Sequence, residues 1–205
     1  FAGYLPVVVD CETGGVDPVQ DALLEIAAVD LVYDEKKMLK QGTCLHYHVE
    51  AFPGGRISEE SLAVTQIRPD HPFRFAKPEA ECLLDLSEKI KALCDKNRAR
   101  RAVLVGHNAN FDLAFLLAAY ERCGMRKQFP FHHFVVLDTV TLSAFFLRET
   151  VLARAVRRAG LSFDVEQAHS ALYDVDRTAE LFCHMVNREA QKKYRSKDAK
   201  NLDAG

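Results

Sequence analysis

Near its start the chain runs through an apolar stretch that ends in carboxylates, Val7-Val8-Val9-Asp10-Cys11-Glu12-Thr13-Gly14-Gly15. Such a run predicts a buried strand, and on a strand the side chains at positions i and i+2 point to the same face. Asp10 and Glu12 are therefore expected side by side at the C-terminal edge of this strand. Two adjacent carboxylates repel each other, and burying them is costly unless a cation lies between them. Hard divalent ions prefer such oxygen ligands. The alternative is a solvated turn ahead of Gly14.

A second junction between a strand and a helix carries a third carboxylate. A short strand at Ala102–Val105 leads into the polar stretch Gly106-His107-Asn108-Ala109-Asn110-Phe111-Asp112. Gly106 suits a tight turn at which the backbone approaches a ligand closely. Asp112 falls in the first turn of the following helix, where an acidic side chain also stabilises the helix without any metal. The simpler interpretation of His107 is a structural histidine.

The third polar cluster, Ala168-His169-Ser170-Ala171-Leu172-Tyr173-Asp174, stands at the start of the last long helix. Ser170 is suited to cap that helix, which leaves His169 on the loop ahead of it and Asp174 one turn inside. A histidine beside carboxylates is a competent general base at neutral pH, because its ordinary pKa is about 6.5. Taken alone, the cluster also fits a surface histidine and a helix-start aspartate.

The rest of the pattern predicts an α/β fold. Apolar or alternating runs predict strands over Leu5–Val9, Leu23–Tyr33, Leu45–Glu50, Ala102–Val105 and Phe134–Leu137. A long proline-containing loop should precede residue 79. Helical spacing predicts helices over Glu79–Asp95, Phe111–Cys123, Thr139–Leu147, Thr150–Ala159 and from near Ser170 past Val186. This order indicates a mixed sheet with helices on its faces. We expect a domain over residues 1–187 and a basic polar tail over 188–205, either a fraying helix end or a contact surface.

Composition limits the class of function. The 205 residues are 48% hydrophobic and 27% charged, as in ordinary globular proteins, and no apolar run approaches the ~18 residues of a membrane span. The net charge of −2 excludes a protein that coats nucleic acid by bulk charge, although it allows a local basic patch. The six cysteines show no C-x-x-C spacing, so we expect reduced thiols in a cytoplasmic protein. Because the first residue is Phe1 rather than Met, we expect residues upstream of it.

Together the three clusters resemble the DEDDh exonuclease family, which includes proofreading exonucleases and oligoribonuclease. Its three motifs correspond to D-x-E-T-G-G from Asp10, G-H-N-A-N-F-D ending at Asp112, and H-x-A-L-x-D from His169 to Asp174. Within that family the chain is most similar to the ribonuclease T group, through D-A-L-L-E-I-A-A (21–28), H-V-E (48–50) and Q-A-H-S-A-L-Y-D (167–174). The resemblance implies a ribonuclease H-like fold, with a five-stranded mixed sheet flanked by helices.

The resemblance also implies an activity. It predicts a metal-dependent 3′-to-5′ exoribonuclease, active also on single-stranded DNA, that trims structured RNAs such as tRNA and releases nucleoside 5′-monophosphates. His169 is expected to take the proton from the attacking water. Two Mg²⁺ ions, which Mn²⁺ can replace, are expected on the four catalytic carboxylates Asp10, Glu12, Asp112 and Asp174.

Aromatic and basic residues complete the substrate surface that the resemblance implies. Relatives stack phenylalanines on the 3′-terminal bases, and base stacking contributes ~1–3 kcal/mol per base. Phe111 and Phe134 keep that residue type, whereas Val16 and Val64 stand where phenylalanine is expected. The family acts as homodimers in which the partner's basic patch lies beside the site. We expect contacts to RNA 3′ ends or single-stranded DNA from Phe111, Phe134, Glu60, Asn108 and the basic residues Arg98, Arg100, Arg101, Arg122, Arg126 and Lys127.

Three other functions are compatible with parts of this pattern. A proofreading subunit for DNA synthesis shares the three motifs, but not the ribonuclease T-type sequence between them. A non-catalytic nucleic-acid-binding domain on the same fold should have lost at least one of the five catalytic residues, and all five are present. A metal-dependent phosphatase does not account for the aromatic residues near the carboxylates.

Overall fold

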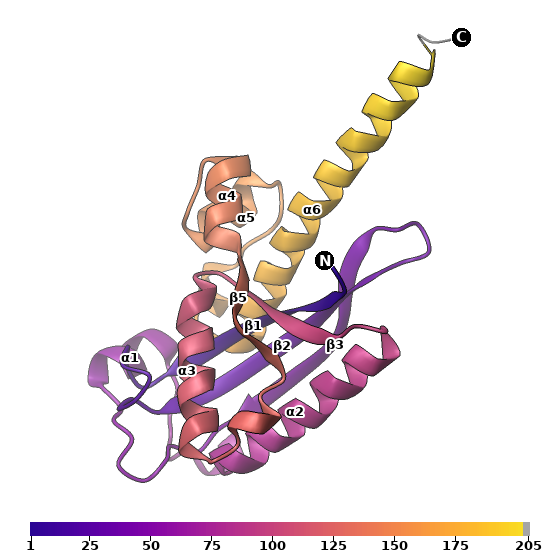
Figure 1. Cartoon of the computed structure of the whole chain (residues 1–205). Coiled ribbons are helices and arrows are strands. Elements are labelled where there is room, and N and C mark those ends of the chain that lie inside the picture. Colours follow the sequence, from indigo (N-terminus) through magenta and orange to yellow (C-terminus); the bar gives the residue numbers. More distant parts are fainter. Residues whose placement is uncertain (203–205) are drawn as a thin grey trace.

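One mixed sheet of five strands organises the molecule, in the order β3-β2-β1-β4-β5 (Figure 1). The computed structural model describes the backbone of residues 1–202 and the side chains of residues 1–192. Strand β1 pairs antiparallel with β2 and parallel with β4, and β3 and β5 form the two edges. The predicted five-stranded mixed sheet flanked by helices is thereby confirmed. The strands are β1 (Tyr4–Thr13), β2 (Leu23–Tyr33), β3 (Leu39–His48), β4 (Arg101–Gly106) and β5 (Phe131–Asp138).

Helices cover both faces of the sheet (Figure 1). On one face, α2 (Glu79–Lys96) and α3 (Ala109–Arg122) pack against Val7 and Val9 of β1, with Leu86, Ile90 and Leu116 in the same core. On the other face, α6 (Ala171–Leu202) packs Val175 and Phe182 against Val8. The alternation along β1 follows from the strand period of two. Shorter helices are α1 (Glu59–Thr65), α4 (Thr139–Leu147) and α5 (Leu152–Arg158), and 3₁₀ turns are η1 (Pro72–Arg74), η2 (Arg126–Gln128) and η3 (Val165–Gln167).

Strand β1 is longer than the apolar run at Leu5–Val9 predicts. Its pairing with β2 continues through Asp10↔Ala27 and Glu12↔Glu25, so both carboxylates lie within the strand rather than beyond its end. They continue the alternation that begins at Val8 and therefore lie on the face that α6 covers. The partner strand supplies the backbone hydrogen bonds that keep these polar residues extended.

Three segments depart from the sequence-based expectation. Strand β3 spans Leu39–His48 instead of Leu45–Glu50, because its pairing with β2 extends from His48 back to Leu39. Helix α1 lies where a loop was expected; Ser58 caps it by accepting a hydrogen bond from the Ser61 backbone N–H at 3.0 Å. The segment expected as a polar tail continues α6 as far as Leu202, and its basic side chains from Lys193 onward lie outside the described residues. No helix in the described part of the chain combines the length and apolar character that a membrane span requires.

Candidate metal centre

Three carboxylates from two distant parts of the chain meet on the α6 face of the sheet. Asp10 and Glu12 come from β1, and Asp174 comes from the first turn of α6. One carboxylate oxygen of each lies within 4.8 Å of the others. The packing of α6 against β1 and β2 brings Asp174 there, because the apolar residues that follow it in the helix are buried against the sheet.

The fourth carboxylate, Asp112, reaches the same place from the opposite helix layer. It is 4% exposed, and its Oδ1 accepts a hydrogen bond of 2.9 Å from the backbone N–H of Cys11. Gly106 makes this approach possible, since a Cβ there would lie 3.0 Å from the Ala109 Cα and 3.3 Å from Asp112 Oδ2. The close approach that requires glycine here is to the start of α3 rather than to a ligand.

Burial raises the pKa values of all four carboxyls, and repulsion between them adds to this effect at Asp10 and Glu12. The pKa of Asp10 lies well above its ordinary value, because of burial first and then the charges of Asp112 and Glu12. Burial, followed by the charge of Asp174, raises the pKa of Glu12 to about 8. The pKa values of Asp112 and Asp174 are raised mainly by burial, and backbone hydrogen bonds from Cys11 and His169, respectively, offset part of that effect. Without a counter-ion the cluster therefore holds protons near neutral pH.

A divalent cation fits this cluster. Among the described side chains, the buried Oδ1 of Asp174 has no hydrogen-bond partner. Buried acceptors without partners are uncommon in folded proteins and call for an explanation. An all-oxygen donor set with several negative charges is the environment that hard divalent ions prefer. The residues present therefore suit Mg²⁺-type coordination.

His169 lies on an exposed loop next to Asp174. Its backbone N–H donates a hydrogen bond of 3.0 Å to Asp174 Oδ2, and its φ of 67° falls in the left-handed region. Few non-glycine residues adopt that conformation, so the hydrogen bond helps to hold it. By contrast, both ring nitrogens of His107 are engaged, Nδ1 with Thr139 Oγ1 at 2.9 Å and Nε2 with the Thr150 carbonyl at 2.8 Å. Those contacts fit a structural histidine.

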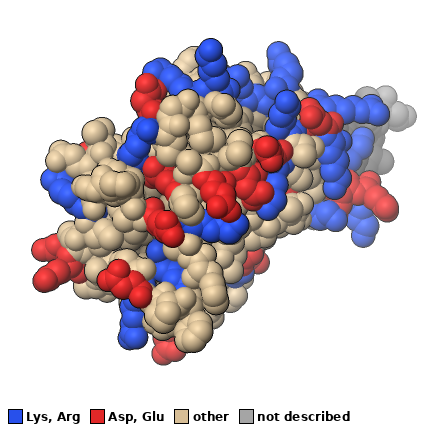
Figure 2. Space-filling view, turned by 90° about the horizontal axis from the view of Figure 1, so that it is seen from below, with Lys and Arg blue, Asp and Glu red and all other residues tan. Residues whose placement is uncertain are grey.

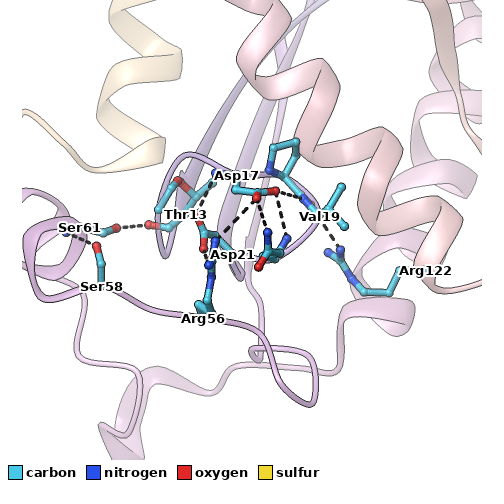
Figure 3. Close-up of polar contacts among 11 residues, drawn as sticks. Thr13, Asp17, Val19, Asp21, Arg56, Ser58, Ser61 and Arg122 are labelled. Carbon is cyan, nitrogen blue, oxygen red and sulfur yellow. Dashed lines mark hydrogen bonds and ion pairs between the residues drawn. The ribbon is translucent and has the colours of Figure 1, made fainter.

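Hydrogen bonds attach α1 to the end of β1 and the turn that follows it (Figure 3). The Ser61 hydroxyl donates to the carbonyl of Thr13, and the Ser58 backbone N–H donates to the carbonyl of Gly14 at 2.8 Å. Close approach explains the two glycines: a Cβ at Gly14 would lie 2.3 Å from the Arg56 carbonyl oxygen, and a Cβ at Gly15 would lie 2.2 Å from an Asp21 carboxylate oxygen. The turn therefore fixes the position of α1, which carries Glu60 and Val64.

The expected substrate-contacting residues differ in exposure. Phe111 is half-buried, with its ring centroid 4.9 Å from that of Phe115, whereas Phe134 is 79% exposed on an irregular part of β5. Glu60 and Asn108 are exposed, and Asn108 adopts a left-handed conformation ahead of α3. The two valines that stand where phenylalanine was expected, Val16 and Val64, are 83% and 51% exposed.

Three of the expected basic residues converge. Arg101, Arg126 and Lys127 line a surface hollow of about 600 Å³, together with His133 and with Glu121, which pairs with Arg126 at 3.0 Å. Figure 2 shows acidic side chains gathered in the middle of one face with basic side chains around them.

Arg122 does not belong to this basic group. Its guanidinium forms two hydrogen bonds to the Glu79 carboxylate, at 2.7 and 2.8 Å, and stacks over the Phe52 ring at 3.9 Å. Arg100 is likewise engaged, through hydrogen bonding to the Ala2 carbonyl at 2.6 Å and stacking on Tyr4. The expectation that Arg122 forms part of the patch was wrong, because it pairs with Glu79. Arg100, in contrast, stays exposed and lines a second surface hollow with Arg101 and Lys127.

One acidic residue beside the cluster was not predicted from the sequence. Glu25 lies directly opposite Glu12 across the β1–β2 ladder and is 6% exposed. Its charge helps to raise the pKa values of Asp10 and Glu12. The signal was present in the sequence, since a glutamate interrupts the otherwise apolar run that begins at Leu23.

Comparisons with known sequences find close relatives. Residues 7–182 match the model of the RNase_T family, described as exonuclease. Ribonuclease T of Photorhabdus laumondii is 49% identical over 191 residues, which cover 93% of this chain and 88% of the relative. Ribonuclease T of Escherichia coli K12 is 46% identical over 188 residues, covering 92% and 87%.

Solved structures share the fold. Exonuclease I of E. coli, in complex with an oligonucleotide, superimposes with a TM-score of 0.68 at 15% identity; the match covers 93% of this chain and spans 43% of exonuclease I. A 3′-exonuclease that recognises a histone mRNA stem-loop gives a TM-score of 0.68 at 13% identity, covering 89% and 81%. At these identities the likeness establishes the fold alone, and it confirms the expected ribonuclease H-like architecture.

Proposed function

Because the chain belongs to the exonuclease family of ribonuclease T, we propose that it is a metal-dependent 3′-to-5′ exonuclease that acts on RNA and single-stranded DNA. The observation that carries this proposal is the convergence of Asp10, Glu12 and Asp174 within 4.8 Å, with Asp112 behind them. Relatives at 46–49% identity over more than nine-tenths of the chain favour this activity over that of a proofreading subunit.

The four carboxylates are assigned to cation binding. Asp10 would hold the ion together with its neighbours, since Asp112, Glu12 and Asp174 all lie close enough for their charges to raise its pKa. Mg²⁺ is the proposed ion, two per site, with Mn²⁺ able to replace it. Once bound, such ions polarise the scissile phosphate and stabilise the leaving oxygen. The protein's own contribution is to hold four oxygen donors in a partly buried site that has no internal cation of its own among the described side chains.

His169 is assigned the role of general base. It takes the proton from the water that attacks the terminal phosphodiester, so that water oxygen bonds to phosphorus while the bond to the 3′ oxygen breaks. The hydrogen bond from its backbone to Asp174 keeps the histidine beside the cluster and leaves the imidazole free. His107 cannot serve, because both its ring nitrogens are engaged. The product is a nucleoside 5′-monophosphate.

Contacts to the terminal bases are assigned to the exposed residues around the cluster. Phe111 is assigned because it stands next to Asp112 in α3. Glu60 and Val64 are assigned because α1, which carries them, is attached to the end of β1. Asn108 is exposed and available for contact. Phe134 is also exposed but packs against His132, which contacts Tyr4 at the start of β1, so its proposed contact lies away from the carboxylates. We propose that structured RNAs with single-stranded 3′ ends, such as tRNA, are the substrates.

A homodimer is proposed to supply the remaining affinity. A carboxylate-rich site repels a polyanion, so binding needs a basic surface elsewhere. The hollow lined by Arg101, Arg126 and Lys127 is the basic surface that the partner subunit would bring to the substrate. A cytoplasmic location, where RNA 3′ ends are processed, is part of the same proposal.

The direction of degradation tests the proposal. One oligonucleotide is labelled at its 3′ end and another at its 5′ end, and each is incubated with the protein in Mg²⁺. The 3′ label should appear at once as a mononucleotide, and the 5′ label should shorten stepwise; a chelator should stop both. Release of the 5′ label first, or cleavage that persists in the chelator, would refute the proposal.

A further inference from the structure

Three side chains outside the proposed catalytic site form a second cluster with metal-ligand spacing. Glu25, His46 and His48 each offer one ligand atom, and these atoms lie within 4.8 Å of one another. The two histidines occupy positions i and i+2 of β3 and therefore point to the same face of the sheet. Glu25 pairs directly with His48 across the β2–β3 ladder, which places its carboxylate on that face as well.

The three side chains already contact one another. His46 Nε2 is hydrogen-bonded to Glu25 Oε1, and the rings of His46 and His48 lie 4.7 Å apart, edge to face. Glu25 is 6% exposed, whereas both histidines are partly exposed. The cluster thus has a fixed, buried carboxylate at its base and imidazoles that open toward solvent.

One cation and two glutamates lie at or near the cluster. The Arg74 guanidinium lies on the same side, where it donates a hydrogen bond to the carbonyl of Leu24. Its charge acts on Glu25 and, after burial, helps to lower the pKa of His48, which keeps that imidazole neutral. Glu12 faces Glu25 from β1 and adds negative charge to the row. Across this face the sheet therefore carries an acidic row that ends in two imidazoles at the β3 edge.

The donor set distinguishes this cluster from the carboxylate site. Two imidazole nitrogens and one carboxylate oxygen are the protein ligands of open zinc sites, which keep a fourth position for water. Borderline ions such as Zn²⁺ and Co²⁺ favour imidazole, whereas Mg²⁺ favours oxygen alone. We propose that Glu25, His46 and His48 form a separate site for a Zn²⁺-type transition-metal ion, one strand away from the carboxylates that take Mg²⁺. This inference rests on β2 and β3 alone and does not depend on the proposed exonuclease activity.

Visible absorption of Co²⁺ tests the proposal, since Co²⁺ replaces Zn²⁺ and its spectrum reports nitrogen ligands and low coordination number. The titration is carried out in excess Mg²⁺, which occupies the all-oxygen site. The wild-type chain should bind Co²⁺ saturably with intense visible bands, and Zn²⁺ should displace it. His48→Ala should weaken binding at least about tenfold, because even loss of a residue that only orients a ligand costs 10–100-fold.

Three further variants distinguish Co²⁺ binding at this cluster from Co²⁺ binding elsewhere on the protein. Asp10→Asn removes a carboxylate of the proposed catalytic site and should leave the Co²⁺ bands unchanged. His132→Ala removes a histidine from β5, at the opposite edge of the sheet, and should do the same. Glu25→Gln keeps the shape of the side chain but loses its charge, so it tests the site if His48→Ala does not fold; it should also weaken binding at least about tenfold. Equal Co²⁺ spectra in the wild type and in Glu25→Gln, or bands that vanish with Asp10→Asn instead, would overturn the proposal.

Discussion

Asp112 Oδ1 accepts a hydrogen bond of 2.9 Å from the backbone N–H of Cys11, the residue that separates Asp10 from Glu12. Strand β4 pairs with β1 only as far as Val8↔Val105, so at Cys11 the carboxylate stands where a strand partner has ended. The Asp112 side chain thus pairs with a backbone N–H of β1 beyond the end of β4, and it also adds a negative charge to the cluster. This one contact therefore serves both the fold and the proposed metal centre.

Replacing Asp112 should separate these two roles. Asp112→Asn keeps an oxygen that accepts from Cys11 and removes a buried charge. We expect the melting temperature of the metal-free protein to rise by several degrees at neutral pH, since 1 kcal/mol corresponds to about 2–4 °C in a domain of this size. Activity should fall sharply in the same variant. Calorimetry and the oligonucleotide assay measure both, and a lower melting temperature would show that the charge stabilises the fold.

Stability of the metal-free protein should decrease as the pH rises. A carboxyl whose pKa is higher in the folded chain stabilises the fold while protonated, and that contribution is lost as the pH rises through the folded pKa. Burial and then Asp174 raise the pKa of Glu12 from 4.5 to about 8. The melting temperature should therefore fall between about pH 4.5 and about pH 8.

Saturating Mg²⁺ should remove most of this pH dependence, because the ion replaces the bound protons. Glu12→Gln should weaken the pH dependence of the melting temperature in the absence of metal. Melting curves in a chelator and in Mg²⁺ test both statements. A metal-free protein that becomes more stable over this range would count against the raised pKa values.

His169 should matter for rate and not for metal binding. His169→Asn is the better variant, because asparagine tolerates the left-handed conformation that φ of 67° requires. Removing a positioned general base costs ~10²–10⁴ in rate. The rise in melting temperature on adding Mg²⁺ should be unchanged. A variant that cleaves at the wild-type rate at pH 8 would exclude His169 as the base.

The basic residues should divide into two classes. Arg122→Ala breaks a largely buried pair with Glu79 and should destabilise the fold by about 3–5 kcal/mol. Arg101→Ala combined with Arg126→Ala should leave stability nearly unchanged and weaken oligonucleotide binding, with a salt slope smaller by ~1–2. Thermal melts and binding at several salt concentrations make the comparison. Similar melting temperatures for the two variants would contradict the assignment of Arg122 to the fold.

Restoring an aromatic ring at Val16 should strengthen substrate binding. The side chain is 83% exposed, so a larger residue meets no packed neighbour. A stacked base contributes ~1–3 kcal/mol, and Val16→Phe should therefore lower KM for oligonucleotides about tenfold. Val19→Phe, at a position that is 71% exposed in the same turn, is the matched control and should change KM little. If both variants behave alike, Val16 does not face the terminal base.

The sequence predicted the regular elements well, because their periodicity is local. Residues 23–33 and 139–147, for example, form the strand and the helix that the pattern predicts. The carboxylates were recognisable because they interrupt or follow apolar runs at the ends of elements. Their convergence required the motif order, since nothing local places Asp174 beside Asp10.

What the sequence did not predict depends on tertiary contacts. Helix α1 has only seven residues and buries none of them, so it shows no apolar periodicity; Ser58 and the bond from Ser61 to Thr13 hold it. Arg122 looked like part of a charge run, but its partner Glu79 is 43 residues away. The pairing of Glu25 with the histidines of β3 likewise depends on strand register, which the sequence left undetermined.

The central claim is that the converging carboxylates drive removal of nucleotides from the 3′ end. The most direct measurement is the rate at which a 3′-labelled oligonucleotide releases labelled mononucleotide in Mg²⁺, compared between Asp10→Asn and Glu35→Gln. Glu35 is an exposed carboxylate in the turn between β2 and β3, so Glu35→Gln should match the wild type. Asp10→Asn should lose at least about 10³-fold, because bound metal supplies several kcal/mol of transition-state stabilisation. A folded Asp10→Asn protein that releases mononucleotide within a few-fold of Glu35→Gln would overturn the account.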